Sequence, residues 1–319
     1  MKKKFEGEIH KGIPNGIGIN KWLDSGSLLA LAKASDTPFS VVTHQEYTCV
    51  EYRMKMNLFT FGKYKCGVQM TVIAPPISVD STAYTGDVNR LIADYKHRKG
   101  IFLILNLPAL PLLTEKAAVG ETLSSCVFHK RFSSFEEYLL ALRGSYRRRL
   151  KKALEKGGAL RVEQIRNADF TDELHGLYRQ VRQRSNYPLE TLRPDFFRGF
   201  DGNIFVFYDG ASPVAFAAVK QFDEELDFVF GGMNYAARDE LDLYYNMLLF
   251  ILRRGIECGA RRIDFGQTAE HSKQRIGCVL EKRYMAAFSG NRLINGLLRL
   301  FGNALTYQAP KEAYQCFKK

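Results

Sequence analysis

The sequence predicts an α/β (α+β) protein of two domains, each with a mixed, mostly antiparallel sheet flanked by helices. Its 319 residues exceed the usual size of one hydrophobic core, at roughly 100 to 200 residues per domain. With 46% hydrophobic and 25% charged residues, the composition is that of a globular protein. Two β-rich regions lie on either side of a basic helix, which predicts a domain over residues 1–132, a connecting helix over 133–158 and a second domain over 159–319.

The first half alternates strand and helix patterns, which favours a layered α/β arrangement. Alternating and β-branched residues predict strands, and Gly100 closes a helical pattern over 86–99. The predicted strands are 39–43, 49–56, 67–73, 101–107 and 123–132.

A basic helix follows, with Ser133 or Ser134 as the cap of its first part. Its second part, SYRRRLKKALEK over 145–156, ends at a double glycine. Arg147, Arg148 and Lys151 belong to the charge that surrounds this helix and leaves a narrow apolar seam.

The second half has a clearer order of elements, β-α-α-β-β-β-α-β-α-β. An Asp-Gly turn and an FDEE turn join its three central strands, which predicts an antiparallel meander. The elements are strand 160–165, helices 169–185 and 194–200, strands 203–208, 213–222 and 225–233, helix 241–258, strand 261–265, helix 268–276 and strand 279–288. A last amphipathic segment, 291–305, predicts a docked helix with Leu293, Leu297, Leu300 and Phe301 on one side, and a membrane-surface helix as the weaker alternative.

Charge and cysteine usage limit the function classes. The net charge of +12 favours an anionic partner such as a nucleotide, a phosphopantetheine carrier, RNA or an acidic lipid surface. Six cysteines show no metal spacing, so we expect reduced thiols, no metal site and a cytoplasmic location. We find no signal peptide pattern and no apolar run of about 20 residues that could cross a bilayer.

The order of elements, together with five stretches, resembles the GNAT superfamily, and more closely the FemAB-like and BioF2-like acyltransferases. The stretches are SYRRRLKKALEKGG, PVAFAAVK, DFVFGGMN, YYNMLLFILRRGIECG and RRIDFGQTAEHSKQRIG. The resemblance covers about 132–288, and the first half by analogy. It implies tandem GNAT-like domains, the first degenerate and the second with splayed strands, and an N-acyltransferase that moves an acetyl, acyl or aminoacyl group to an amine acceptor.

The resemblance implies a donor site where the strand ending DFVFGGMN opens. We expect Gly231, Gly232 and Asn234 to hold the donor there, with Tyr244 and Tyr245 at the head of the following helix. A glycine pair inside a strand also fits a packing kink without a ligand. The usual GNAT pyrophosphate loop is absent, so the donor stays open among acyl-CoA or another acyl thioester, acyl carrier protein and aminoacyl-tRNA, and no further cofactor is required.

The DFGQ corner is the predicted catalytic centre. We assign Asp264 to orient or deprotonate the acceptor amine and Gln267 to hydrogen-bond it, although a turn role would also explain Asp264. Lys273 and Arg275 would anchor an acceptor carboxylate or phosphate. No tyrosine follows at the place where many GNAT enzymes carry their acid. Ser272, His271 or Tyr284 could substitute, or an ester donor such as aminoacyl-tRNA would not need the same acid.

The basic helix leaves a second function class open. Arg147, Arg148 and Lys151 would bind tRNA or an acidic carrier protein in an enzyme. In a non-catalytic adaptor on the same scaffold, they would bind RNA or an acidic partner. The oligomeric state is not predicted.

Overall fold

The computed structural model describes residues 4–57, 61, 66–111, 117–186, 190–309 and 314–318, with Ala304 described by its backbone alone. The chain divides into two compact units. Unit 1 comprises Met1–Ser124, Leu189–Thr191 and Lys282–Ala309, and unit 2 comprises Ser125–Pro188, Leu192–Glu281 and Pro310–Lys319. The predicted boundaries had placed 282–309 with the second half of the chain. These residues group with unit 1 because the second half of the long strand β13 (Val279–Ser289) pairs with a strand of that unit.

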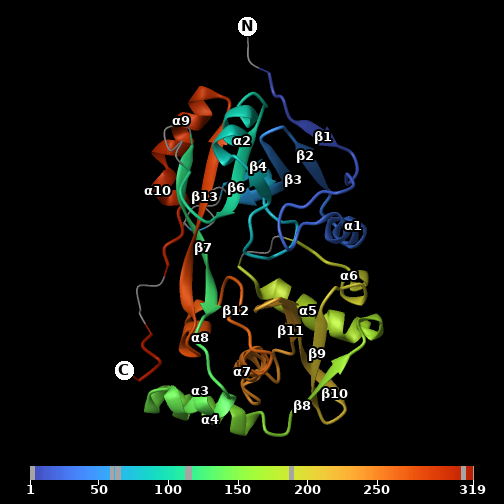
Figure 1. Ribbon diagram of the computed structural model, residues 1–319, viewed down its shortest axis with the longest axis vertical. Helices are drawn as coiled ribbons and strands as arrows, with labels where there is room; N and C mark the ends of the chain where they lie inside the picture. The colour runs from blue at the N-terminus through green and yellow to red at the C-terminus, as the bar shows by residue number, and fades with distance from the viewer. Residues whose placement is uncertain are drawn as a thin grey trace. The chain divides into compact units, whose positions relative to one another are not determined.

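Unit 1 contains a sheet in the order β1-β2-β3-β4-β6-β13 (Figure 1). Its pairs are antiparallel except β4 with β6, and β5 pairs with β3. The strands are β1 (Glu8–His10), β2 (Phe39–Thr43), β3 (Tyr47–Asn57), β4 (Gly67–Ile73), β5 (Tyr84–Gly86) and β6 (Ile101–Leu107). The helices are α1 (Ser25–Ala34), α2 (Val88–Tyr95), α9 (Arg292–Leu300) and α10 (Gly302–Leu305).

In unit 2 the strand order is β12, β11, β10, β9 and β8, and the end of β7 pairs with β12. The strands are β7 (Ala118–Phe128), of which 118–124 group with unit 1, β8 (Arg161–Ile165), β9 (Asn203–Asp209), β10 (Ser212–Phe222), β11 (Glu225–Met233) and β12 (Arg262–Asp264). The helices are α3 (Phe135–Ala141), α4 (Gly144–Lys156), α5 (Asp172–Arg184), α6 (Pro194–Arg198), α7 (Leu243–Glu257) and α8 (Glu270–Arg275), with a 3₁₀ turn at Asn167–Asp169. The predicted mixed, mostly antiparallel fold is confirmed, since β11 with β12 is the one parallel pair among the described strand pairs of this unit.

Helices α5 and α7 cover opposite faces of the β10–β11 hairpin. Side chains of neighbouring strand residues point to opposite faces of a sheet. A Cβ on Gly232 would meet Leu177 of α5, whereas one on Gly231 would meet Met247 of α7. The meander and both its turns are therefore as predicted, with Gly210 in the left-handed region at φ 57°.

Two elements of unit 1 differ from expectation. Helix α1 was not predicted, although Asp24 caps it by accepting a hydrogen bond from the Ser27 amide. Helix α9 is docked by Leu298, which is buried, whereas Leu293, Leu297 and Leu300 are exposed. The predicted packing of that leucine side is therefore wrong.

No helix in the described part of the chain combines the length and apolar character needed to cross a bilayer.

Candidate active site

Strand β11 has one fully paired edge and one mostly open edge. Its antiparallel ladder with β10 continues through Gly231 and Gly232 to Met233, with a bulge near Ala218. Its parallel ladder with β12 covers three pairs and stops at Asp227 with Asp264. The two strands therefore diverge from Phe228 onward, before the double glycine at which the opening was predicted.

The register fixes which backbone groups point toward the open edge. The amide of Asn234 donates to the carbonyl of Val214, which continues the register by one residue. Because hydrogen-bonded and non-hydrogen-bonded pairs alternate in an antiparallel ladder, Gly232 is the next residue bonded to β10. The amides of Gly231 and Met233 therefore point away from β10, where no described strand pairs with them.

The double glycine itself has a packing explanation. A Cβ on Gly232 would lie 2.2 Å from Cε1 of Phe216 and 2.8 Å from Cβ of Leu177. A Cβ on Gly231 would lie 3.0 Å from the tip of the Phe228 ring and 3.3 Å from the Met247 sulfur. Gly232 is thus required by the core, while Gly231 keeps the backbone clear beside flexible side chains.

A strained turn follows β12 next to this edge. Gly266, Thr268 and Ala269 all have positive φ, at 69°, 66° and 49°. A β-branched residue such as Thr268 adopts this conformation at a cost of roughly 1 to 2 kcal/mol. A Cβ on Gly266 would lie 3.8 Å from the carbonyl oxygen of Phe228, which brings the turn to the point where β11 becomes free. Strain of this kind is concentrated at functional sites.

Two predicted site residues hold the turn from inside. Asp264 is buried and accepts a 2.7 Å hydrogen bond from the amide of Gly266 through Oδ1. Lys273 is also buried, and its Nζ donates to the carbonyls of Gly266 and Gln267 at 3.2 and 2.7 Å. Burial lowers the pKa of Lys273, against the opposing negative charges of groups such as Asp264. The ammonium group faces backbone carbonyls, not solvent.

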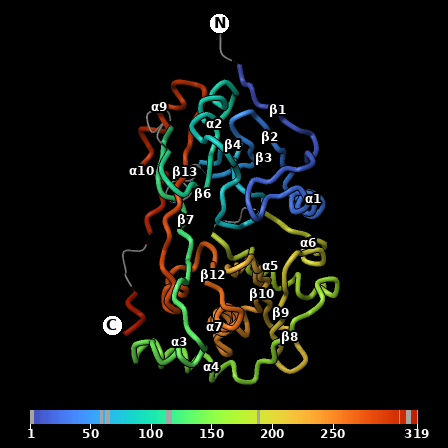
Figure 2. Tube along the Cα trace, in the orientation of Figure 1, coloured from blue at the N-terminus to red at the C-terminus, as the bar shows by residue number. Residues whose placement is uncertain are grey.

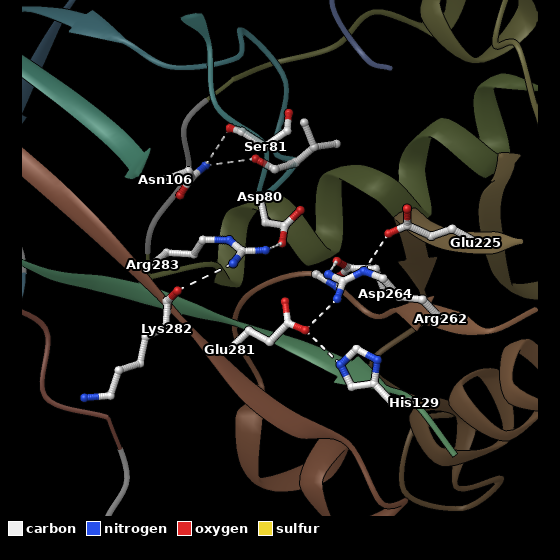
Figure 3. Close-up of polar contacts among 12 residues, drawn as sticks. Asp80, Ser81, Asn106, His129, Glu225, Arg262, Asp264, Glu281, Lys282 and Arg283 are labelled. Carbon is white, nitrogen blue, oxygen red and sulfur yellow. Dashed lines mark hydrogen bonds and ion pairs between the residues drawn. The ribbon is translucent and has the colours of Figure 1, made fainter. Parts of the chain in front are cut away.

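Arg262 balances the acidic side of the site (Figure 3). Its guanidinium contacts Glu225, Asp264 and Glu281 at 2.6, 2.7 and 2.6 Å, and His129 contacts the same oxygen of Glu281 at 2.8 Å. Burial opposes the charge on Arg262, but these carboxylates outweigh it and raise its pKa. Glu225, Asp227 and Asp264 are the one group with metal-binding spacing among the described residues, and the Arg262 guanidinium contacts two of them, Glu225 and Asp264.

The predicted tyrosines lie at the first turn of α7. Tyr244 is partly exposed, and burial of its hydroxyl, with nearby Cys126 and Cys278, raises its pKa. The same two cysteines are neighbours of Lys273, so Tyr244 lies near the turn. Tyr245 is buried, hydrogen-bonds Arg275 and carries the Arg149 guanidinium 4.5 Å from its ring centre.

The other predicted residues lie elsewhere. Arg148 and Lys151 are exposed on α4, and Arg147 is partly exposed. Tyr284 lies in unit 1, on β13 opposite Leu107. Asn234 accepts a hydrogen bond from the amide of Ala236 with its side chain. The structure thus brings Asp264, Gln267, Lys273 and Tyr244 together within unit 2.

Sequence reasoning missed two arginines. Arg262 precedes Asp264 by two residues on one strand, a spacing that puts both side chains on one face. Arg149 makes a bidentate pair with Asp242 at the start of α7, at 2.8 and 2.9 Å. It thereby offsets the charge of one of the three acidic residues, Asp239, Glu240 and Asp242, that precede α7.

Comparison with known proteins agrees with this geometry. Residues 141–274, less than half of the chain, match the family model described as acetyltransferase (GNAT) domain, so this segment is similar to GNAT domains. No curated protein sequence matches the chain.

Two of three similar solved structures, the first two below, support the same fold. A C-terminal domain (DUF2156) of a putative lysylphosphatidylglycerol synthetase from Agrobacterium fabrum is 13% identical, with a TM-score of 0.50 over 82% of this chain and 88% of that one. L-PGS from Bacillus licheniformis is 14% identical, with a TM-score of 0.52 over 86% and 90%. A structure of FemX is 11% identical, with a TM-score of 0.49 over 90% and 95%.

Proposed function

We propose that the GNAT domain transfers an acyl or aminoacyl group from an activated donor to an amine, with the donor carbonyl at the open edge of β11. The observation that carries this proposal is the pair of amides, of Gly231 and Met233, that point away from β10 toward the part of the edge where no described strand pairs with β11. Acyl transfer forms a tetrahedral oxyanion, which preorganised backbone donors stabilise by several kcal/mol, about 2.7 to 4 per donor in one well-studied case.

The turn at 264–269 would position the acceptor amine next to the donor carbonyl. The nitrogen attacks the carbonyl carbon, and the C–S or C–O bond to the donor breaks. The proton that the nitrogen loses ends on the thiolate or alkoxide that leaves. In this proposal Asp264 keeps the turn in shape and orients the acceptor through it, while Gln267 hydrogen-bonds the acceptor. Burial raises the pKa of the Tyr244 hydroxyl, so in this proposal Tyr244 donates a hydrogen bond to the leaving group and is a weaker acid than an exposed tyrosine.

Acyl-CoA, acyl carrier protein and aminoacyl-tRNA are the candidate donors. Arg148 and Lys151 are solvent-exposed and would contact the phosphates of tRNA or an acidic carrier surface. The name of the Agrobacterium fabrum protein adds lysyl transfer and a phospholipid acceptor to the chemistry worth testing. Among these donors we favour aminoacyl-tRNA, and thus a FemAB-like aminoacyl transfer, because the exposed Arg148 and Lys151 suit the phosphates of tRNA.

A transfer assay on the full chain tests the proposal. Labelled acetyl-CoA, acyl carrier protein and lysyl-tRNA are each offered with a panel of amines, and the product is followed by mass spectrometry. We expect one donor to be consumed, and Asp264→Asn and Gln267→Ala to lower kcat at least ten-fold. Asp209→Asn, an exposed aspartate at the end of β9, is the matched control and should retain wild-type turnover. Equal turnover in all three variants would show that the site is elsewhere.

A non-catalytic adaptor is the competing function, and the exposed Arg148, Lys151 and Lys152 on α4 are the observation that favours it. Binding of tRNA that weakens with salt, is lost in Arg148→Glu with Lys151→Glu, and is unchanged in Asp264→Asn would support the adaptor if no donor is consumed. Both functions predict salt-sensitive binding, so consumption of a donor decides between them.

A further inference from the structure

Helix α9 exposes a continuous apolar face. Leu293, Leu297 and Leu300 are 81%, 55% and 74% exposed, and Phe301 after the helix is 47% exposed. At 100° per residue these four side chains fall within one arc of the helix. Figure 2 follows the chain from β13 into α9 and α10 in red, at the edge of unit 1. Exposed apolar faces of this kind are uncommon on soluble proteins and mark interaction surfaces.

The helix is nevertheless firmly placed. Asn291 caps it by accepting from the amides of Leu293 and Ile294. Leu298 and Leu305 are buried in the core of unit 1 with Leu103 and Ala287. The exposed leucines therefore result from the way α9 docks, and its buried side is a different one.

The surroundings of the apolar face are basic. Residues 284–309 contain two arginines, Arg292 and Arg299, and no aspartate or glutamate. Arg292 and Arg299 are exposed and lie on the helix beside the leucine arc. Lys99 is exposed and lies in the segment that follows α2. The backbone of this segment is next to the start of α9, because a Cβ placed on Gly290 would collide with the carbonyl oxygen of Lys96. Figure 1 shows α2 and α9 at the same end of unit 1.

We infer that α9 docks the protein on an anionic membrane surface, with its leucines in the acyl boundary and Arg292, Arg299 and Lys99 at the headgroups. An amphipathic helix with apolar residues on one side and arginines beside them lies in the plane of a bilayer. Basic residues then add attraction to anionic lipids. With nine residues, α9 is too short to span a bilayer and suits the interface.

A second copy of this chain fits the same face less well. A two-fold interface brings identical patches together, so Arg292 and Arg299 would meet their own copies. The helix carries no acidic residue to pair with them, and like charges across an interface oppose binding. The surface inference is independent of acyl transfer, since it rests on α9 and Lys99, which lie in unit 1 outside the candidate active site.

Vesicle sedimentation of the full-length protein tests the inference. We expect binding to vesicles of phosphatidylglycerol and phosphatidylcholine in equal parts, and little binding to pure phosphatidylcholine. Leu293→Ser with Leu297→Ser should reduce the bound fraction at least ten-fold. Arg292→Gln and Arg299→Gln should each weaken binding roughly five-fold, as expected for about 1 kcal/mol per basic residue.

Matched controls exist elsewhere on the chain. Leu140 on α3 is 64% exposed and Arg179 on α5 is exposed, so Leu140→Ser and Arg179→Gln should leave binding unchanged. Circular dichroism melting checks that the variants fold. The inference is overturned if the leucine variants bind vesicles like the wild type. It is also overturned if light scattering shows a dimer that these variants dissociate while the wild type ignores vesicles.

Discussion

The buried ammonium of Lys273 donates a 2.7 Å hydrogen bond to the carbonyl oxygen of Gln267, and through it one short helix holds the turn beside the open edge of β11. The sequence had assigned Lys273 to a bound acceptor. Its contacts within the described residues give it a role in positioning, because its Nζ donates to two carbonyls of the turn itself.

Replacing this lysine tests that role. Lys273→Met leaves the carbonyls of Gly266 and Gln267 without this donor, which should cost about 1 to 3 kcal/mol of stability and lower turnover with it. Urea unfolding measures the first effect and the transfer assay the second. Lys11→Met, at an exposed site in unit 1, should change neither.

The same residue predicts a pH dependence of stability. Because the pKa of Lys273 is lowered from 10.5 in the folded protein, the unfolded chain binds more protons between the two values. The folded state therefore gains stability from this group as pH rises through that window, and the gain is complete above 10.5. The slope of unfolding free energy against pH should be smaller in Lys273→Met, and equal slopes would argue against a buried ammonium.

Arg262 should be among the most sensitive positions for stability. Arg262→Met removes the positive charge that faces Asp264, Glu225 and Glu281. Since Asp264 is buried, we expect a loss of about 3 to 5 kcal/mol near neutral pH. Thermal unfolding at pH 7 and pH 5 provides the measurement, and a smaller loss at the lower pH would reflect protonation of the carboxylates. A loss below 1 kcal/mol would mean that water replaces the guanidinium.

The two adjacent glycines should respond differently to alanine. Gly232→Ala places a methyl group against the Phe216 ring and Leu177, so we expect a loss of about 1 to 3 kcal/mol. Gly231→Ala meets the ends of Phe228 and Met247, which can move, and should cost less. Denaturation of the pair under identical conditions tests the order. The reverse order would contradict the register of β11.

Relief of strain at Thr268 separates stability from activity. Asparagine tolerates positive φ better than a β-branched residue, so Thr268→Asn should raise stability by up to about 1 kcal/mol. If the turn contributes to the reaction, the same variant should lower kcat. A more stable variant with unchanged turnover would leave the turn without a part in catalysis.

Thiol labelling provides an independent test of burial. Cys66 and Cys258 are exposed, while the other four cysteines are buried. Burial raises the pKa of Cys49 to about 12 and that of Cys316 to about 11. Iodoacetamide at pH 8 should therefore modify Cys66 and Cys258 in the native protein, and all six after denaturation. Rapid native labelling of Cys278 would show that unit 2 opens.

Periodicity and turn chemistry predicted the elements of unit 2, including the β10–β11 hairpin and the cap that Ser134 provides for α3. They could not predict the divergence of β11 from β12, because this depends on how far a three-residue strand extends. The leucine pattern of α9 identified which residues share a side. It did not predict that the side with Leu298 would be buried, because an amphipathic pattern does not specify which side of a helix packs against the rest of the protein.

The discontinuous division of the chain also bears on biosynthesis. Unit 1 takes its last segment from Lys282–Ala309, although it begins at Met1. A ribosome therefore makes nearly all of unit 2 while β6 still awaits its neighbour β13. Nascent chains halted before residue 282 should leave β6 with an uncovered edge, where a chaperone would bind, and truncation at this point should yield aggregates instead of a folded fragment.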